Sequence, residues 1–197
     1  MKKAVLLLLL VSSAAIAQKM KVVSGDFKNL AGIKEYNLAF DYAGVTVDKF
    51  KTEEEFLADK MKKREEKGKD EDFKTSWFAD REKRYEPKFI ESFNKRFDDG
   101  AVKADKGLTA AKYLMTVKTI WIHPGYNVGI SRSNSKITTE ITISEAANPS
   151  NKLLVVNYDK AEGAGAMGYD FDSGYRISES YAKLAKEFAA DIKKKAK

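Results

Sequence analysis

The sequence contains no cysteine and only one histidine, His123. Without thiols the chain forms no disulfide, holds no metal through thiolates and has no cysteine nucleophile. A single histidine excludes multi-histidine zinc sites, and a serine nucleophile would depend on this one base. The Gly-x-Ser-x-Gly motif of many serine hydrolases is also missing. We therefore expect no metal and no cofactor, and the sequence favours a protein without enzymatic activity.

The sequence also lacks long blocks of like charge. Its formal net charge is +7, of which Lys2 and Lys3 supply two positive charges, and the other basic residues are largely interleaved with acidic ones. A surface that follows nucleic-acid phosphates needs segregated positive charge. We therefore expect no nucleic-acid partner.

Long apolar runs are scarce, and the clearest lies at residues 4–11, directly after two lysines. It is too short to span a bilayer, and Ala15 and Ala17 supply the small residues that a signal peptidase reads. We predict a signal peptide at residues 1–17 and a single α/β domain at 18–197. The mature chain would begin at Gln18 and be exported, periplasmic or extracellular. No cysteine is available for a lipid anchor, and no later run predicts a transmembrane segment.

The centre of the chain has the period of two that is typical of half-buried strands. Three runs show it, at 113–123, 136–144 and 152–158. Ile137, Ile141 and Ile143 alternate with polar residues, as in a sheet that is covered on one face. We expect an α+β fold with two layers: a mainly antiparallel sheet that contains a three-strand meander, covered by about three to four helices.

The helices are predicted by capping signals and apolar stripes. Thr52 and Glu55 have capping-box spacing, which predicts a helix from about residue 53 to 66. Apolar spacing predicts helices over 73–85 and 87–97, with Pro87 opening the second one. The apolar residues of 177–192 recur at helical spacing and predict a terminal helix of about five turns.

Matching both faces of the first two strands predicts their antiparallel register. Lys118 then lies opposite Glu140, with Met115 beside Ile143, Val117 beside Ile141 and Trp121 beside Ile137 on the core side, and Thr116 beside Thr142 outside. A slip of one residue would turn the isoleucines to solvent.

We expect any binding site at one end of the sheet, where the loops 124–134 and 162–175 would meet. These loops combine aromatic faces with polar tips on a glycine-rich backbone, which suits recognition. The alternative is that the glycines only let the two loops pack together. The candidate ligand-binding residues are His123, Tyr126, Arg132, Tyr169, Asp170, Asp172 and Tyr175.

Two motifs in the second loop have ordinary explanations. Residues 163–168 have the spacing of a dinucleotide fingerprint, but no helix opens within the glycines and no further strand follows. Asp170 and Asp172 could begin a calcium loop, yet the remaining ligands of that motif are absent. Capping of the last helix by Asp172 or Ser173 explains them better.

Three phrases carry a resemblance to known proteins: residues 84–89, 124–129 and 168–174 (RYEPKF, PGYNVG and GYDFDSG). On these phrases the chain resembles an uncharacterised family of small exported Bacteroidetes proteins. More loosely, the order of its elements is similar to the small α/β domains of cell-envelope lipoproteins that act as adaptors. The resemblance implies no catalytic residues.

The sequence thus favours an exported, non-enzymatic binding or adaptor module of the cell envelope. Its partner would be an envelope protein, a glycan or an apolar small molecule. The alternative is a hydrolase of unrecognised type that uses His123 or the carboxylates near Asp170. A third interpretation is a purely structural protein.

Overall fold

The computed structural model describes residues 19–97, 100–164 and 172–197. The candidate residues Tyr169 and Asp170, and the predicted signal peptide, lie outside these ranges. The strands are β1 (Lys19–Gly25), β2 (Glu35–Asp41), β3 (Thr46–Val47), β4 (Lys103–Asp105), β5 (Tyr113–His123), β6 (Tyr126–Asn127), β7 (Arg132–Ser133), β8 (Lys136–Glu145) and β9 (Lys152–Glu162). The α-helices are α1 (Glu53–Lys62), α2 (Asp70–Asp80), α3 (Glu86–Asn94) and α4 (Ser173–Lys195).

One mixed sheet holds most of the strands, in the order β1-β9-β8-β5-β2-β4, with β3 paired to β5 beyond the end of β2. The fold is therefore a mixture of α and β structure, as expected. The expectation of a mainly antiparallel sheet is not confirmed. Strands β1, β9, β8 and β5 pair antiparallel, whereas β2 with β5, β2 with β4 and β3 with β5 pair in parallel. The parallel pairs arise because the chain leaves the sheet after β3 through α1, α2 and α3 before it returns.

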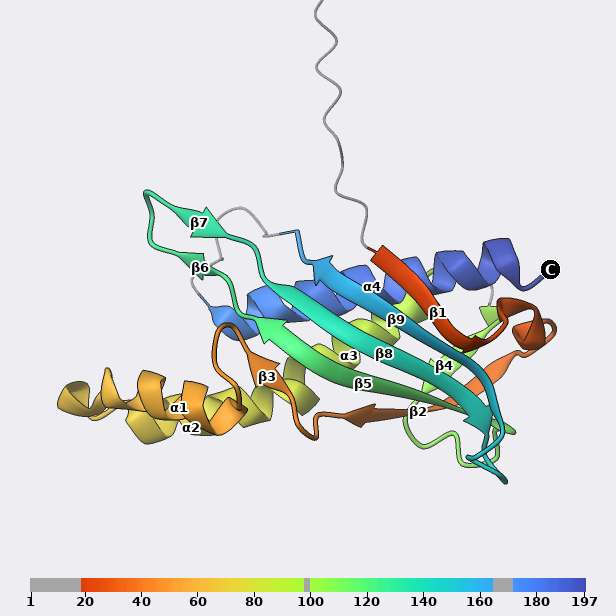
Figure 1. Cartoon of the computed structure of the whole chain (residues 1–197), viewed down its shortest axis with the longest axis horizontal. Helices are drawn as coiled ribbons and strands as arrows, with labels where there is room; N and C mark the ends of the chain where they lie inside the picture. Colours follow the sequence, from red (N-terminus) through yellow and green to blue (C-terminus); the bar gives the residue numbers. More distant parts are fainter. Residues whose placement is uncertain (1–18, 98–99, 165–171) are drawn as a thin grey trace, which may run out of the picture.

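The expected meander is interrupted. Strands β5, β8 and β9 are antiparallel neighbours, but a separate two-stranded ribbon, β6 with β7, stands between β5 and β8 in the chain. In Figure 1 this ribbon projects beyond the end of the main sheet, at the same end of the molecule as α1 and α2. The alternating pattern of the long strands did not indicate such a short pair.

The β5–β8 register agrees with the prediction over most of its length. Lys118 lies opposite Glu140, and Met115 and Val117 lie opposite Ile143 and Ile141. The predicted pairing of Trp121 with Ile137 is wrong. An irregularity between Thr119 and Trp121 shifts the register, so Trp121 lies opposite Thr138, while Ile122 lies opposite Ile137. A bulge of this kind re-aims the side chains that follow it.

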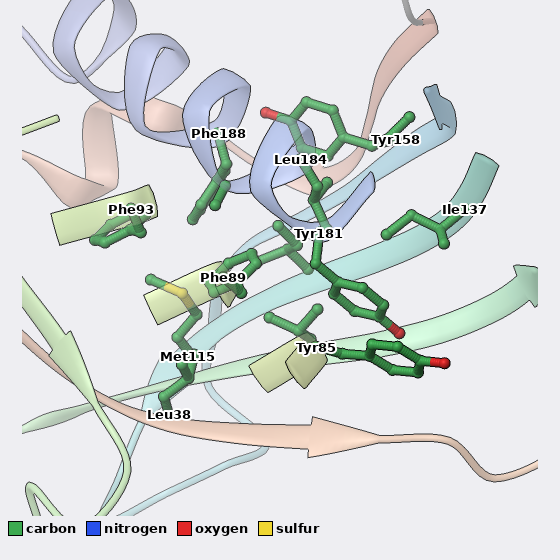
Figure 2. Packing of buried hydrophobic residues seen from close by; sticks show 14 of the residues in the cluster. Leu38, Tyr85, Phe89, Phe93, Met115, Ile137, Tyr158, Tyr181, Leu184 and Phe188 are labelled. Atoms are coloured by element: carbon green, nitrogen blue, oxygen red, sulfur yellow. The ribbon is translucent and has the colours of Figure 1, made fainter. Parts of the chain in front are cut away.

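The core lies between the sheet and the pair of helices α3 and α4. Figure 2 shows Phe89, Phe93 and Phe188 from the helices packed over Met115 and Leu38 of the sheet. The aromatic rings of Tyr85 and Tyr181 stack, with centroids 5.2 Å apart. The phenylalanines of the helix predicted over 87–97, which are Phe89, Phe93 and Phe97, are therefore part of the core. Burial of large side chains at about 25 cal/mol per Å² makes this the main source of stability.

The path from α2 to α3 differs from the prediction in one respect. Pro87 lies in the first turn of α3, as expected for a proline that opens a helix. The chain does not break before it, because a π-helical turn, Arg81–Tyr85, joins α2 to α3. The wider π turn accommodates a residue that cannot donate the backbone hydrogen bond of a regular helix. It places Arg81 beside Glu53 of α1 and Arg84 beside Asp172, the residue before α4.

Candidate functional site

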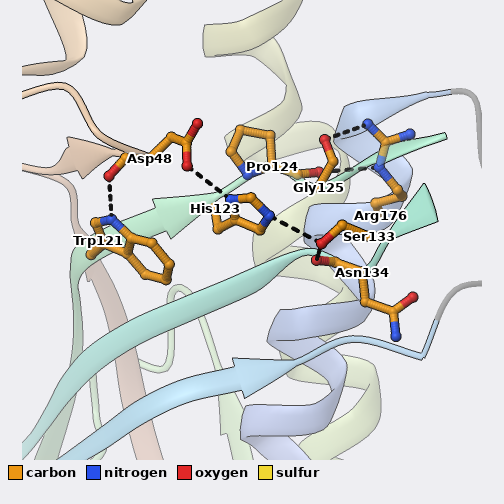
Figure 3. A network of polar contacts seen from close by, with 8 residues as sticks. All are labelled: Asp48, Trp121, His123, Pro124, Gly125, Ser133, Asn134 and Arg176. Atoms are coloured by element: carbon orange, nitrogen blue, oxygen red, sulfur yellow. Dashed lines mark hydrogen bonds and ion pairs between the residues drawn. The ribbon is translucent and has the colours of Figure 1, made fainter. Parts of the chain in front are cut away.

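A chain of polar contacts passes through His123, the last residue of β5. Its Nδ1 lies 3.0 Å from Oδ1 of Asp48, and its Nε2 lies 3.3 Å from Oγ of Ser133 (Figure 3). Asp48 follows β3 with a positive φ of 54°, which is uncommon for a residue other than glycine. The Asp48 amide donates to the Ile122 carbonyl at 2.7 Å, which fixes the aspartate beside the end of β5.

Trp121 and His123 are two residues apart on β5 and share a face, and the bulge places this face away from the buried side of Met115 and Val117. The Trp121 and His123 rings stack with centroids 6.0 Å apart, and the Trp121 indole N–H donates to the Asp48 carbonyl at 2.9 Å. The carboxylate of Asp48 contacts the imidazole, and its carbonyl accepts from the indole. Asp48 therefore sets the positions of both rings through two different groups.

Arg176, in the first turns of α4, holds the loop that follows His123. Its guanidinium donates to the carbonyls of Pro124 and Gly125 at 3.1 and 3.2 Å (Figure 3). Gly125 has a φ of +65°, and a Cβ placed there would lie 2.4 Å from the carbonyl oxygen of Ser133. The close approach of the loop to β7 therefore requires glycine.

These residues border a pocket of about 350 Å³. Segments from three parts of the chain form it: the β3–α1–α2 region, the end of β5 with the start of the ribbon, and the start of α4. The lining residues are Asp48, Phe56, Lys60, Lys63, Arg64, Phe73, His123, Pro124, Gly125, Tyr126, Ser173 and Arg176. The volume lies within the range of small-molecule pockets, at its lower end.

The pocket wall combines aromatic faces with an excess of positive charge. Among the lining residues that the structure describes, four are basic and one, Asp48, is acidic. The guanidinium of Arg64 lies over the Phe73 ring at 4.2 Å, and Lys60 lies over the Phe56 ring at 5.4 Å. The aromatic rings help to hold Arg64 and Lys60 at the wall. Lys60 and Lys63 also pair with Asp59, which is not a lining residue, at 3.7 and 2.8 Å. The lining therefore suits a ligand that carries acidic groups.

A buried ion pair keeps α1 against α2 and so shapes this wall. Glu53, at the first position of α1, contacts the Arg81 guanidinium at 2.5 and 2.6 Å and accepts from the Trp77 indole at 2.7 Å. Thr52 caps α1 through the Glu55 amide at 3.1 Å, as its capping-box spacing predicted. The helix ends at Lys62, earlier than predicted, and a short 3-10 turn follows.

Two carboxylates share Arg84 at the start of α4 and have pKa shifts of opposite sign. Burial raises the pKa of Asp80, although Arg84 lies 3.0 Å away. Burial also opposes ionisation of Asp172, but hydrogen bonds from Arg84 and from the Gly174 amide outweigh it and lower the pKa of Asp172. Asp172 is the N-cap of α4, as the capping interpretation predicted. A Cβ at Gly174 would lie 2.0 Å from the Asp80 carboxylate, so a larger residue there would displace the Asp80 side chain.

The structure separates the candidate residues that were named from sequence. His123 and Tyr126 line the 350 Å³ pocket. Asp172 and Tyr175 line a neighbouring cavity of about 670 Å³ between α3 and α4. Arg132 lies exposed on the ribbon and lines neither cavity. The two loops touch where the first ends and the second begins, since the Asn134 side chain donates to the Glu162 carboxylate at 2.9 Å; residues 165–171 of the second loop lie outside the described ranges.

Sequence reasoning missed Asp48, Ser133, Arg176 and the α1–α2 wall. Asp48 follows a strand of two residues, and no pattern in the sequence pairs it with His123. Arg176 precedes the apolar stripe of α4, where an arginine in the first turns ordinarily faces solvent. The one available signal was the aromatic spacing of Phe73 and Trp77, which indicated a buried face on α2.

A larger cavity, of about 720 Å³, lies at the opposite end of the sheet. Residues 31–35 and 110–113 form much of its lining, together with Gly100 and Lys103. It contains one aromatic residue, Tyr113, and no chain of polar contacts comparable to that of His123. We therefore place the candidate site at the His123 end despite the smaller volume.

Comparisons with known proteins assign no function, since no family model, curated protein or solved structure matches the chain significantly. The resemblance to exported Bacteroidetes proteins stays a prediction. Within residues 19–97, 100–164 and 172–197, no helix is both long and apolar enough to cross a bilayer. The same ranges contain no cluster of three or more histidine or acidic side chains arranged to hold a metal ion.

Proposed function

We propose that the protein is an exported, non-enzymatic binding module of the cell envelope, and that it binds an acidic ligand in the pocket beside His123. The export rests on the predicted signal peptide at residues 1–17. The ligand class rests on the wall chemistry: the described lining holds four basic groups and one carboxylate, interleaved with aromatic rings, and Asp59 pairs with two of the four, Lys60 and Lys63. Acidic glycans and acidic peptide segments both have this chemistry.

One observation supports the site above the others: distant parts of the chain converge on the pocket and are held there by buried contacts. Glu53 with Arg81 fixes the α1–α2 wall, and Arg176 fixes the loop at Gly125. A wall that is already ordered loses little conformational entropy when a ligand binds. Trp121, stacked on the lining residue His123, supplies a spectroscopic reporter beside the pocket.

The test is binding of the mature protein to arrays of acidic and neutral glycans and peptides, followed by Trp121 fluorescence in a Trp77→Phe background, because the chain has two tryptophans. The variant Lys60→Glu with Lys63→Glu reverses two charges of the wall. The matched control, Lys21→Glu with Lys152→Glu, changes net charge equally on exposed lysines of β1 and β9. We expect at least tenfold weaker binding for the first pair and less than a twofold change for the second, and equal losses would refute this placement.

A hydrolase remains the second candidate function, because Asp48, His123 and Ser133 lie in the order of a catalytic triad. Asp48 orients one ring nitrogen, and the other faces a hydroxyl. Ser133, however, is not among the lining residues of the pocket, and its Oγ also lies 3.4 Å from the Asn134 carbonyl.

A screen of ester and amide substrates separates the two functions. The binding module predicts no turnover by the wild type above that of a Ser133→Ala variant. Turnover that both Ser133→Ala and His123→Ala abolish, with folding intact, would establish the hydrolase instead.

A further inference from the structure

The ribbon formed by β6 and β7, residues 126–133, exposes apolar side chains at its tip. Ile130 is 99% exposed and Val128 is 65% exposed, the two largest exposures among the large hydrophobic residues of the described chain. Tyr126 is 45% exposed at the start of the ribbon. Soluble surfaces carry scattered apolar residues, but two such residues at the tip of a projecting element call for a partner.

The ribbon is fixed at its base and ordered by its own contacts. Arg176 holds the carbonyls of Pro124 and Gly125, and His123 lies 3.3 Å from Ser133. At the tip, Val128 donates to the Ser131 carbonyl at 3.0 Å, and Gly129 donates to the Asn127 side chain at 3.0 Å. The exposure of Val128 and Ile130 therefore follows from a defined turn.

The charge carried by the ribbon is positive. Arg132 is the one charged residue between Pro124 and Ser135, and it is exposed. Lys136 pairs with Glu162, and the pocket lysines Lys60 and Lys63 pair with Asp59. An aliphatic tip, an aromatic neck and an exposed arginine match the layers of an anionic membrane interface, where aromatic rings lie at headgroup depth.

The size of the tip also favours lipid over protein. A stable protein interface buries about 800 Å² on each partner, far more than two side chains at a two-stranded tip present. Insertion into the headgroup region needs only a few apolar side chains, supported by attraction of basic residues to anionic lipid.

We propose that the tip of the β6–β7 ribbon inserts into an anionic lipid surface and holds the exported protein peripherally at the membrane. The occupant is the headgroup layer, with Val128 and Ile130 entering it and Arg132 contacting lipid phosphate. This goes beyond the pocket proposal and does not depend on it, since the tip and the pocket are different surfaces.

Co-sedimentation of the mature protein with vesicles tests this, using equal parts phosphatidylglycerol and phosphatidylcholine against phosphatidylcholine alone. We expect binding to the anionic vesicles that weakens as salt rises. The variant Val128→Ser with Ile130→Ser should bind at least tenfold more weakly. The control Val22→Ser with Val23→Ser removes two exposed valines from the edge strand β1 and should change binding less than twofold.

Circular dichroism and urea midpoints confirm that both variants remain folded, which exposed substitutions allow. Absence of wild-type binding to the anionic vesicles would overturn the proposal. Equal losses in the two valine variants would also overturn it. So would capture of an envelope protein that depends on Val128 and Ile130 while the vesicles stay unbound.

Discussion

Two glycines of the ribbon, Gly125 at its base and Gly129 at its tip, give a matched test of its geometry. Gly125 and Gly129 both have positive φ, +65° and +81°. An alanine at either position adopts a left-handed conformation, which costs about 1 to 2 kcal/mol for an L-residue. The positions differ in space: nothing lies within 4 Å of a Cβ at Gly129, whereas a Cβ at Gly125 lies 2.4 Å from the Ser133 carbonyl oxygen.

The close contact at Gly125 involves backbone, so no side-chain rotation relieves it. The loop must separate from β7, which weakens the hydrogen bonds from Arg176 to the carbonyls of Pro124 and Gly125. Hydrogen bonds from a charged donor contribute about 1.5 to 3 kcal/mol each. We therefore expect Gly129→Ala to lower the free energy of unfolding by about 1 kcal/mol, and Gly125→Ala to lower it by about 3 kcal/mol or more.

Urea unfolding of both variants, followed by circular dichroism, measures the difference. Hydrogen exchange at the amides of Val128 and Ile130 reports whether the ribbon itself opens, since these amides bond within its turn. Equal destabilisation of the two variants, within about 0.5 kcal/mol, would refute the close approach of Gly125 to Ser133.

Three further predictions concern the groups that frame the site. Asp172→Asn keeps the capping oxygen but loses the Arg84 ion pair. Folding lowers the pKa of Asp172, so the wild-type carboxylate stabilises the fold above about pH 4. This stabilisation is lost as the pH falls through the lowered pKa. Asp80→Asn should show the opposite trend, because a raised pKa means that the charged form costs stability at pH 7 and that this cost disappears on acidification. Urea midpoints at pH 3 and pH 7 test both variants. Parallel trends in the two variants would contradict the assigned pKa shifts. Glu53→Gln should lower the free energy of unfolding by about 3 kcal/mol, because it leaves the largely buried Arg81 without its counter-charge. The control Glu54→Gln changes an exposed residue and should alter stability by less than about 0.5 kcal/mol. Similar values for the two variants would count against the ion pair of Glu53 with Arg81.

The sequence was informative where one face of a strand or helix is buried over many residues. The isoleucines of β8 and the alternation in β5 fixed which residues face the core, and the first half of the register followed from pairing them. The terminal helix was predicted for the same reason, because its stripe at 177–192 repeats over five turns.

What could not be predicted depends on single residues and short elements. The bulge after Thr119 has no signature in the β5 sequence, yet it turns Trp121 and His123 toward the site. Strands of two residues, such as β3 and β6, carry too little pattern to be recognised. Strand direction also escaped prediction, because alternation is the same in parallel and antiparallel neighbours.

The most direct test of the pocket beside His123 is an NMR titration of the labelled mature protein with the acidic ligand that binds most tightly in the arrays. We expect chemical-shift changes at the Trp121 indole, the His123 ring and the amides of Gly125 and Tyr126. Changes confined to the opposite end of the sheet, around Gly32, Lys103 and Tyr113, would contradict it.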